Sequence, residues 1–246
     1  AHCFPPDAMR DLISLPSLEA HGLIFAIPSH GETPDFGPWL GEVTEDLESL
    51  DLGAHRVFDH WSRRDPVNWK LAVDGFLEGY HLSRAHASSI SKYFLNNQGI
   101  YEQSGPHIRY MMAKRSIKDL QETDPQGWRL RDHCLTVQTL FPATFIQVLS
   151  DHVFIHLMWP SGPTEVRKDT WLLVPENSDR PDRYWEANRD LAKAAFDEDY
   201  AVNQTVQCSV DSGMLDHLVF GRCEQGPQWL HATLADVSSG RLRPPV

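Results

Sequence analysis

The stretch from Glu78 to His86, EGYHLSRAH, combines one carboxylate with two imidazoles at short spacing. His81 follows Glu78 by three residues, and His86 follows His81 by five. Imidazole is a frequent ligand of transition metals, and a carboxylate beside it can orient the ring. We therefore treat this stretch first as a candidate metal site.

The spacing of the two histidines alone does not show that they bind one metal ion. Residues five apart on a regular α-helix are separated by about 140° around the axis. Zinc proteases use an i, i+4 pair, which places both rings on one face. His81 and His86 can share an ion only if the helix breaks or bulges, and LSRA between them contains no strong breaker. The alternative is that each is an ordinary solvated or hydrogen-bonded histidine.

A third candidate ligand lies in the later segment AFDEDYAVNQTVQ. Asp199 falls between Ala195 and Val202 in the apolar stripe of a predicted helix. An unpaired carboxylate buried there would cost several kcal/mol, so we expect a cation or hydrogen-bond donors beside it. We expect the neighbours Asp197 and Glu198 to face water. Two histidines and this aspartate would form the triad that holds iron(II) on one octahedral face; a slightly rotated helix is the alternative.

The histidine pair is expected on an amphipathic helix. Asp65-Pro66 predicts an N-cap followed by proline at the first helical position. The apolar positions that follow have helical spacing: Trp69, Val73, Phe76, Leu77 and Tyr80. On such a helix Asp74, Glu78 and His81 share one face.

The middle of the chain changes to β-branched and aromatic runs. The expected strands are residues 107–113, 134–141, 144–150, 152–159 and 168–174, after an irregular region over 1–60 with one strand-like piece at 21–27. The short LSDHV junction predicts a hairpin, and a second long helix with Leu191, Ala195, Val202 and Val206 on its apolar stripe follows PENSDRPD. This order predicts an α+β fold with long helices on a curved antiparallel sheet.

Composition narrows the classes of function. The formal charge is −12, with no basic cluster, so we expect neither nucleic acid nor an anionic membrane as partner. The apolar run GLIFAIP is far shorter than the ~20 residues of a membrane-spanning helix. The cysteines are scattered and form no C-x-x-C or C-x-H motif: Cys3, Cys134, Cys208 and Cys223. We expect a reduced, cytoplasmic protein.

Several ordered motifs resemble the catalytic domain of Rieske non-haem iron oxygenases, the α subunit of ring-hydroxylating dioxygenases and related monooxygenases. NWK at 68–70 precedes the Glu78, His81 and His86 spacing, and DEDYAVNQTVQCSVDSG carries Asp199. LPSLEAHGLIFA and FGRCEQGPQWLHATL are also similar to family segments. The resemblance covers roughly residues 15–235, which makes it far more specific than the triad spacing alone.

The resemblance implies a helix-grip, START-like fold with mononuclear iron(II) on His81, His86 and Asp199. It implies that Glu78 is the acid linking the iron to a Rieske [2Fe-2S] cluster in the neighbouring subunit of a homotrimer. Dioxygen and a small organic substrate would react at the iron, and an aromatic ring or another C–H bond of the substrate would be hydroxylated. Glu78 with the DED motif is more similar to α-only oxygenases, including those acting on quaternary amines. Asn68 and Asp74 are candidates to support the imidazoles, or simply to cap and brace the helix.

The chain departs from the family in lacking the C-x-H and C-x-x-H motifs of a Rieske domain. We expect residues 1–246 to be a single catalytic domain, which is either excised from a longer chain or receives electrons from a separate Rieske or ferredoxin–reductase donor. Two other functions stay open. One is a non-enzymatic START-like module that binds an apolar ligand, and the other is a zinc hydrolase with Glu78 as general base. The alternation of side chains along the predicted strands does not indicate which strand face points into a substrate pocket.

Overall fold

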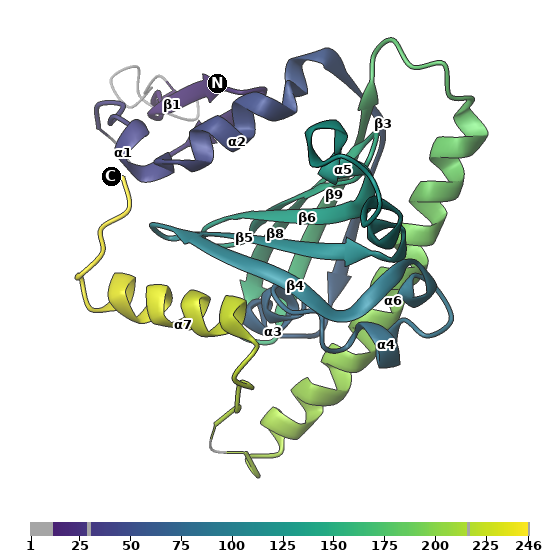
Figure 1. Cartoon of the computed structure of the whole chain (residues 1–246). Helices are drawn as coiled ribbons and strands as arrows, with labels where there is room; N and C mark the ends of the chain where they lie inside the picture. The colour runs from purple at the N-terminus through teal and green to yellow at the C-terminus, as the bar shows by residue number, and fades with distance from the viewer. Residues whose placement is uncertain (1–11, 29–30, 216, 246) are drawn as a thin grey trace, which may run out of the picture.

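A seven-stranded antiparallel sheet forms the centre of the computed structural model, which describes residues 12–28, 31–215 and 217–245 (Figure 1). The strand order is β3-β9-β8-β7-β6-β5-β4. The strands are β3 (His55–Asp65), β4 (Phe94–Ser104), β5 (His107–Lys114), β6 (Cys134–Leu140), β7 (Thr144–Val148), β8 (Val153–Gly162) and β9 (Glu165–Pro175). The expected α+β helix-grip architecture is confirmed.

The five strands expected from the middle of the sequence are all present, as β5 to β9, and β7 and β8 form the expected hairpin. The two long strands that were not expected, β3 and β4, are the two edges of the sheet. Both carry many polar and exposed side chains. Edge strands are commonly polar because this discourages pairing with other chains, and the same polarity hides their strand pattern.

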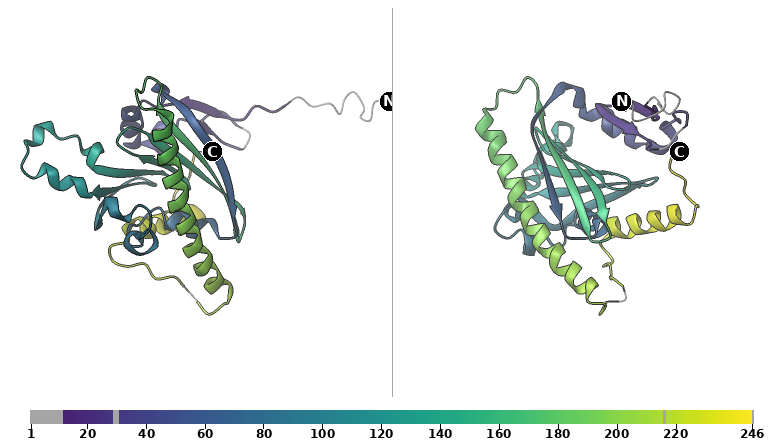
Figure 2. Two further views of the ribbon diagram at one scale, coloured as in Figure 1. Left: turned by 90° about the vertical axis from the view of Figure 1, so that its right-hand side faces the viewer. Right: turned by 180° about the vertical axis from the view of Figure 1, so that it is seen from behind.

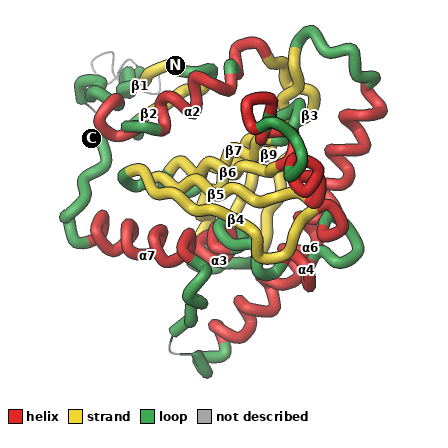
Figure 3. Tube along the Cα trace, in the orientation of Figure 1, coloured by secondary structure: helices red, strands yellow, loops and turns green. Residues whose placement is uncertain are grey.

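Helices cover both faces of the sheet. The long α6 (Asp182–Asp211) crosses one side, as Figures 1 and 2 show, and shares that side with α7 (Gln225–Ser238) and α3 (Trp69–Asp74). The opposite side packs against α2 (Val43–Leu50). The remaining elements are short (Figure 3): β1 (Ser17–Ala20), β2 (Leu23–Ala26), α1 (Gly37–Leu40), α4 (Leu82–Ala85), α5 (Leu130–His133) and 3₁₀ turns at Leu52–Ala54, Ser91–Tyr93, Arg115–Leu120 and Pro125–Gly127.

Strand alternation sends neighbouring side chains into separate cores. On β7, Phe145 packs with the cluster that contains Val73, Leu77 and Leu230, while Ile146 packs with Leu47 of α2. Successive strand residues point to opposite faces of a sheet, so one strand anchors both layers. The region before residue 60, expected to be irregular with one strand-like piece, contains two strands and two helices before β3.

The first site-bearing helix begins and ends elsewhere than expected. Asp65 is the last residue of β3, and the N-cap of α3 is Asn68, whose side chain accepts a hydrogen bond from the Lys70 amide at 2.9 Å. The helix ends at Asp74. Asp74, Glu78 and His81 therefore do not share a helix face, and Tyr80 is 47% exposed rather than part of the core.

The apolar stripe of α6 also differs from the expectation. Its buried residues include Ala195, Phe196 and Tyr200, whereas Val202 is 44% exposed. In the part of the chain that the structure describes, none of the helices combines the length and apolar character needed to cross a bilayer. Cys134, Cys208 and Cys223 are free thiols, and Cys3 lies outside the described residues.

Candidate metal centre

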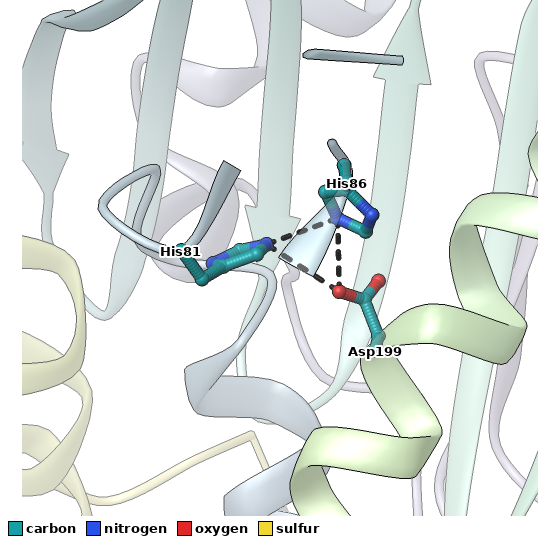
Figure 4. A group of neighbouring side chains, drawn as sticks. All are labelled: His81, His86 and Asp199. Atoms are coloured by element: carbon teal, nitrogen blue, oxygen red, sulfur yellow. Dashed lines mark hydrogen bonds and ion pairs between the residues drawn. The ribbon is translucent and has the colours of Figure 1, made fainter. Parts of the chain in front are cut away.

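Three side chains from two separate segments meet at one point. His81 and His86 flank α4, and Asp199 comes from the middle of α6 (Figure 4). The two Nε2 atoms are 3.2 Å apart, and Asp199 Oδ1 lies 3.4 Å from His81 Nε2 and 3.0 Å from His86 Nε2. The structure thus brings together the three residues that the sequence singled out as a ligand set.

These distances are those of ligands around one ion. With metal–ligand bonds of about 2.1 Å, two ligand atoms lie about 3.0 Å apart at an octahedral angle and about 3.4 Å apart at a tetrahedral angle. The three observed separations span this interval. The donor set therefore fits a divalent transition metal in either geometry, and the spacing does not itself choose between iron and zinc.

A break in the helix resolves the difficulty of the i, i+5 spacing. The chain leaves helical geometry after Asp74 and re-enters it only for the single turn of α4, where His81 is the N-cap and His86 the C-cap. Gly79 lies within the break, and a Cβ there would meet the Tyr110 hydroxyl at 2.1 Å. Only glycine fits this approach, so Gly75 and Gly79, on either side of FLE, are the sequence signal for the break.

Glu78 holds the first imidazole. One carboxylate oxygen accepts a short hydrogen bond from His81 Nδ1, and the other accepts from the backbone amides of Tyr80 and His81. This arrangement places the proton of His81 on Nδ1 and leaves the Nε2 lone pair directed at the triad. The Glu78 carboxylate also satisfies amide groups that the helix break would otherwise leave unpaired.

Glu198 holds the second imidazole, which corrects the expectation that it faces water. Its carboxylate accepts from His86 Nδ1 at 2.9 Å and from the hydroxyls of Ser88, at 2.9 Å, and Ser89. Asp197, by contrast, is 69% exposed, as expected. Each histidine of the triad therefore has a carboxylate on Nδ1 and directs Nε2 toward the other triad members, the pattern that orients histidine ligands of metals.

The charges of the site favour a cation. Burial works to lower the pKa of His86, but the hydrogen bonds to Asp199 and Glu198 and the negative charges of these carboxylates outweigh it, so the pKa is raised. Burial works to raise the pKa of Glu198, and the serine and His86 donors instead lower it. Asp199, Glu198 and Glu78 together place three carboxylates around two imidazoles, and a divalent ion would balance most of this negative charge.

Asn68 and Asp74 have other partners. Asn68 caps α3 and donates to the Pro163 carbonyl at 2.6 Å. Asp74 accepts from His231 Nε2 of α7 at 3.1 Å. Among the described residues neither makes a hydrogen bond to a triad side chain, so they brace the helices, and Glu78 and Glu198 contact the imidazoles instead.

One cavity adjoins the centre, and a second cavity shares a lining residue with it. The adjoining cavity, of about 60 Å³, is lined by His81, Asp199, Glu78, Phe76 and Phe196 among others. Its size suits a few water molecules or a diatomic gas but not an aromatic ring. A second cavity of about 370 Å³, which we call the α6 cavity, lies along the N-terminal half of α6 and shares Phe196 with the first.

Comparison with known proteins identifies the family. The profile described as "Ring hydroxylating alpha subunit (catalytic domain)" matches residues 52–240. The chain belongs to this family. The ring-hydroxylating family domain accounts for β3 to α7, including the segments that carry the histidines and Asp199.

Individual relatives are more distant. The terminal oxygenase component subunit alpha 2 of terephthalate 1,2-dioxygenase from Comamonas sp. is 26% identical over 166 residues, covering 57% of this chain. A crystal structure of a quaternary ammonium Rieske monooxygenase with an inhibitor superposes with a TM-score of 0.73 at 16% identity over 90% of the chain. Dicamba monooxygenase bound to dicamba gives a TM-score of 0.59 at 12% identity over 92% of the chain.

The chain is shorter than these relatives. It spans 40% of the length of the terephthalate dioxygenase subunit and 61% of the quaternary ammonium monooxygenase chain. The structural matches, at such low identity, establish the shared fold of the ring-hydroxylating family domain.

Proposed function

We propose that this domain activates dioxygen at a mononuclear iron(II) held by His81, His86 and Asp199, and hydroxylates an aromatic or other small organic molecule. The observation that carries the proposal is the pairing of each imidazole with its own carboxylate, which directs both Nε2 atoms toward Asp199 Oδ1. Iron supplies the one-electron chemistry with dioxygen that amino-acid side chains lack.

The protein's own contribution is to orient the ligands and restrict the volume around them. An ion held by these three side chains would keep coordination positions free for dioxygen, and the 60 Å³ cavity lined by His81 and Asp199 adjoins the site. Phe76 and Phe196 form an apolar wall of that cavity, which limits water. Phe196 also separates it from the α6 cavity, which has the volume for an organic substrate.

Glu78 is proposed to connect the centre to its electron donor, a Rieske [2Fe-2S] cluster or ferredoxin–reductase pair that acts from outside this domain. Its carboxylate touches His81 Nδ1 and is 15% exposed, so it can be approached from the protein surface. A homotrimer, in which the donor cluster comes from the neighbouring subunit, is part of the same proposal, as is a cytoplasmic location. Membership in the ring-hydroxylating family supports these features.

The zinc hydrolase alternative is disfavoured by the surroundings of Glu78. A general base needs a carboxylate free to take a proton from water. Both oxygens of Glu78 are already engaged by His81 and by backbone amides. The START-like binding module is disfavoured by the ligand set, because an apolar ligand does not require two carboxylate-oriented imidazoles.

Isotope labelling tests the proposed reaction. The iron-loaded domain, supplied with a reduced Rieske-type donor and a panel of aromatic and quaternary ammonium compounds, is assayed under heavy-isotope dioxygen. The proposal predicts product oxygen derived from dioxygen, and loss of product in His81→Ala. Product oxygen derived from water, or turnover by the zinc-loaded domain without dioxygen, would establish a hydrolase instead.

A further inference from the structure

The α6 cavity has an apolar wall and one polar end. Its volume of about 370 Å³ is within the range of small-molecule sites. The apolar lining includes Ile90, Phe94, Leu135, Phe154, Leu191 and Phe196. Phe196 also lines the small cavity at the triad, so this end faces the candidate metal centre.

The polar end contains a lysine with neutral partners. Lys114 Nζ donates to Ser150 Oγ at 2.8 Å and to the Asp132 carbonyl at 3.2 Å. Over the described ranges, no carboxylate forms an ion pair with Lys114. Burial lowers the pKa of this ammonium group, because partial removal from water penalises its charge. An anion in the cavity would relieve that penalty.

The carboxylate at this end is already engaged. Asp151 accepts from His152 Nδ1 at 2.9 Å and from the Tyr184 hydroxyl at 2.9 Å, and Arg180 lies 3.6 Å away. Asp151 therefore has close partners, whereas Lys114 makes no ion pair among the described residues, although Asp132 and Asp151 act on its charge through space. A cationic ligand would meet Lys114 without a free carboxylate to balance it.

His152 offers a second hydrogen-bonding position. It is 2% exposed and lines the cavity, and its Nε2 has no partner in the described part of the chain. Because Nδ1 donates to Asp151, Nε2 carries the lone pair of the neutral ring and is an acceptor. It therefore offers a ligand carboxylate no donor, and the donors at this end are Lys114 and Ser150.

The polar end is remote from the triad. Tyr184, which binds Asp151, precedes Asp199 on α6 by 15 residues, or about 22 Å of helix. A ligand anchored at Lys114 would therefore extend its apolar part toward Phe196, away from its charged group.

We propose that the α6 cavity binds a small, mainly apolar carboxylate, with the carboxylate held by Lys114 and Ser150 and the apolar part directed to Phe196. This deepens the proposed function, and it rests on that function only in making the ligand the substrate. It favours an aromatic or aliphatic acid over the quaternary amines considered from the sequence.

Three probes that share a ring and differ in charge test the proposal on the metal-free protein. Calorimetry with benzoate, benzamide and benzyltrimethylammonium should give the tightest binding for benzoate. Ala192→Phe, which fills the cavity wall, should abolish binding of benzoate and benzamide alike. Absence of benzoate binding in the millimolar range, preference for benzyltrimethylammonium, or indifference to Ala192→Phe would each overturn the proposal.

Variants of Lys114 test whether this residue supplies the positive charge that binds the carboxylate. Lys114→Met should weaken benzoate binding roughly tenfold to a hundredfold, leaving benzamide nearly unchanged, and Lys114→Arg should retain the preference. Lys118→Met, an exposed lysine four residues away, is the matched control. Equal loss of both probes in folded Lys114→Met would contradict the assignment. Because these measurements need no metal, failure of the iron site would leave them interpretable.

Discussion

Three consecutive acidic residues on α6 have three different surroundings. Asp197 is largely exposed, Glu198 accepts from His86 and two serines, and Asp199 lies against both imidazoles. Positions three and four after Ala195 both lie on the buried side of a helix. Periodicity therefore predicted Asp199 correctly but placed Glu198 wrongly in water, because its contact with His86 could not be inferred without the fold.

Removing the Glu198 charge should weaken metal binding. Glu198→Gln retains the volume of the side chain but reduces its hold on His86 Nδ1, and loss of such partners typically lowers metal affinity about tenfold to a hundredfold. Competition with a chromophoric chelator measures the change.

Glu186→Gln is the matched control, because Glu186 lies on the same helix and is exposed. Equal affinities of the Glu198 and Glu186 variants would show that Glu198 does not support the ligand set.

The position of the histidines depends on the interruption between helices α3 and α4, which packs against two other elements. The segment from Gly75 to His81 passes between Tyr110 of β5 and the start of α7. Gly226 of α7 is the closest neighbour on that side, since a Cβ there would meet the Leu77 carbonyl at 2.4 Å. Helix α7 therefore positions the histidine segment although it supplies no ligand.

Gly226→Ala should separate α7 from this segment. Overpacking at such a contact costs about 1–3 kcal/mol in the free energy of unfolding, and we expect a weaker metal affinity as well, because the displaced backbone leads into His81. Urea unfolding and metal titration measure both effects.

Gly127→Ala is the control, because nothing lies within 4 Å of a Cβ at that exposed turn. If Gly226→Ala were as stable as Gly127→Ala, α7 could move away from Leu77 at no cost in stability, which would contradict the prediction.

The sequence predicted the central strands and the long helix α6 but missed the two edge strands and the helix break. Interior strands such as β7 and β9 are largely buried and carry strong apolar patterns. The break depends on Tyr110, which is distant in sequence from Gly79. Local periodicity detects burial, but it does not detect a steric contact made across the fold.

One buried histidine on the sheet, His107 of β5, links the sheet to the N-terminal helix α1. His107 Nε2 donates to the Trp39 carbonyl of α1 at 3.0 Å, and its Nδ1 accepts from the Phe141 amide at 3.0 Å. The side chain is 1% exposed. Burial lowers the pKa of His107 to about 4, although the Trp39 hydrogen bond opposes the shift.

This histidine should make the fold sensitive to acid. Between an unfolded pKa of about 6.5 and the folded pKa of about 4, the unfolded chain binds the proton more readily. The free energy of unfolding therefore falls as the pH falls through this window, by about 2–3 kcal/mol at pH ~4.5 from His107 alone.

His107→Gln can retain both hydrogen bonds without titrating. Urea unfolding of both proteins near pH 7 and pH ~4.5 should show a smaller loss of stability on acidification in the variant. An equal loss in the two proteins would exclude His107 as the acid-sensitive group.

The central claim is that His81, His86 and Asp199 hold one iron ion. The direct measurement is metal content after anaerobic reconstitution with iron(II), on the native protein and on His81→Ala, Asp199→Ala and the exposed control Asp197→Ala. We predict about one iron per chain in the native and Asp197→Ala proteins, and loss of iron in the other two. No bound iron in the native protein, or iron retained in folded His81→Ala and Asp199→Ala, would contradict the assignment.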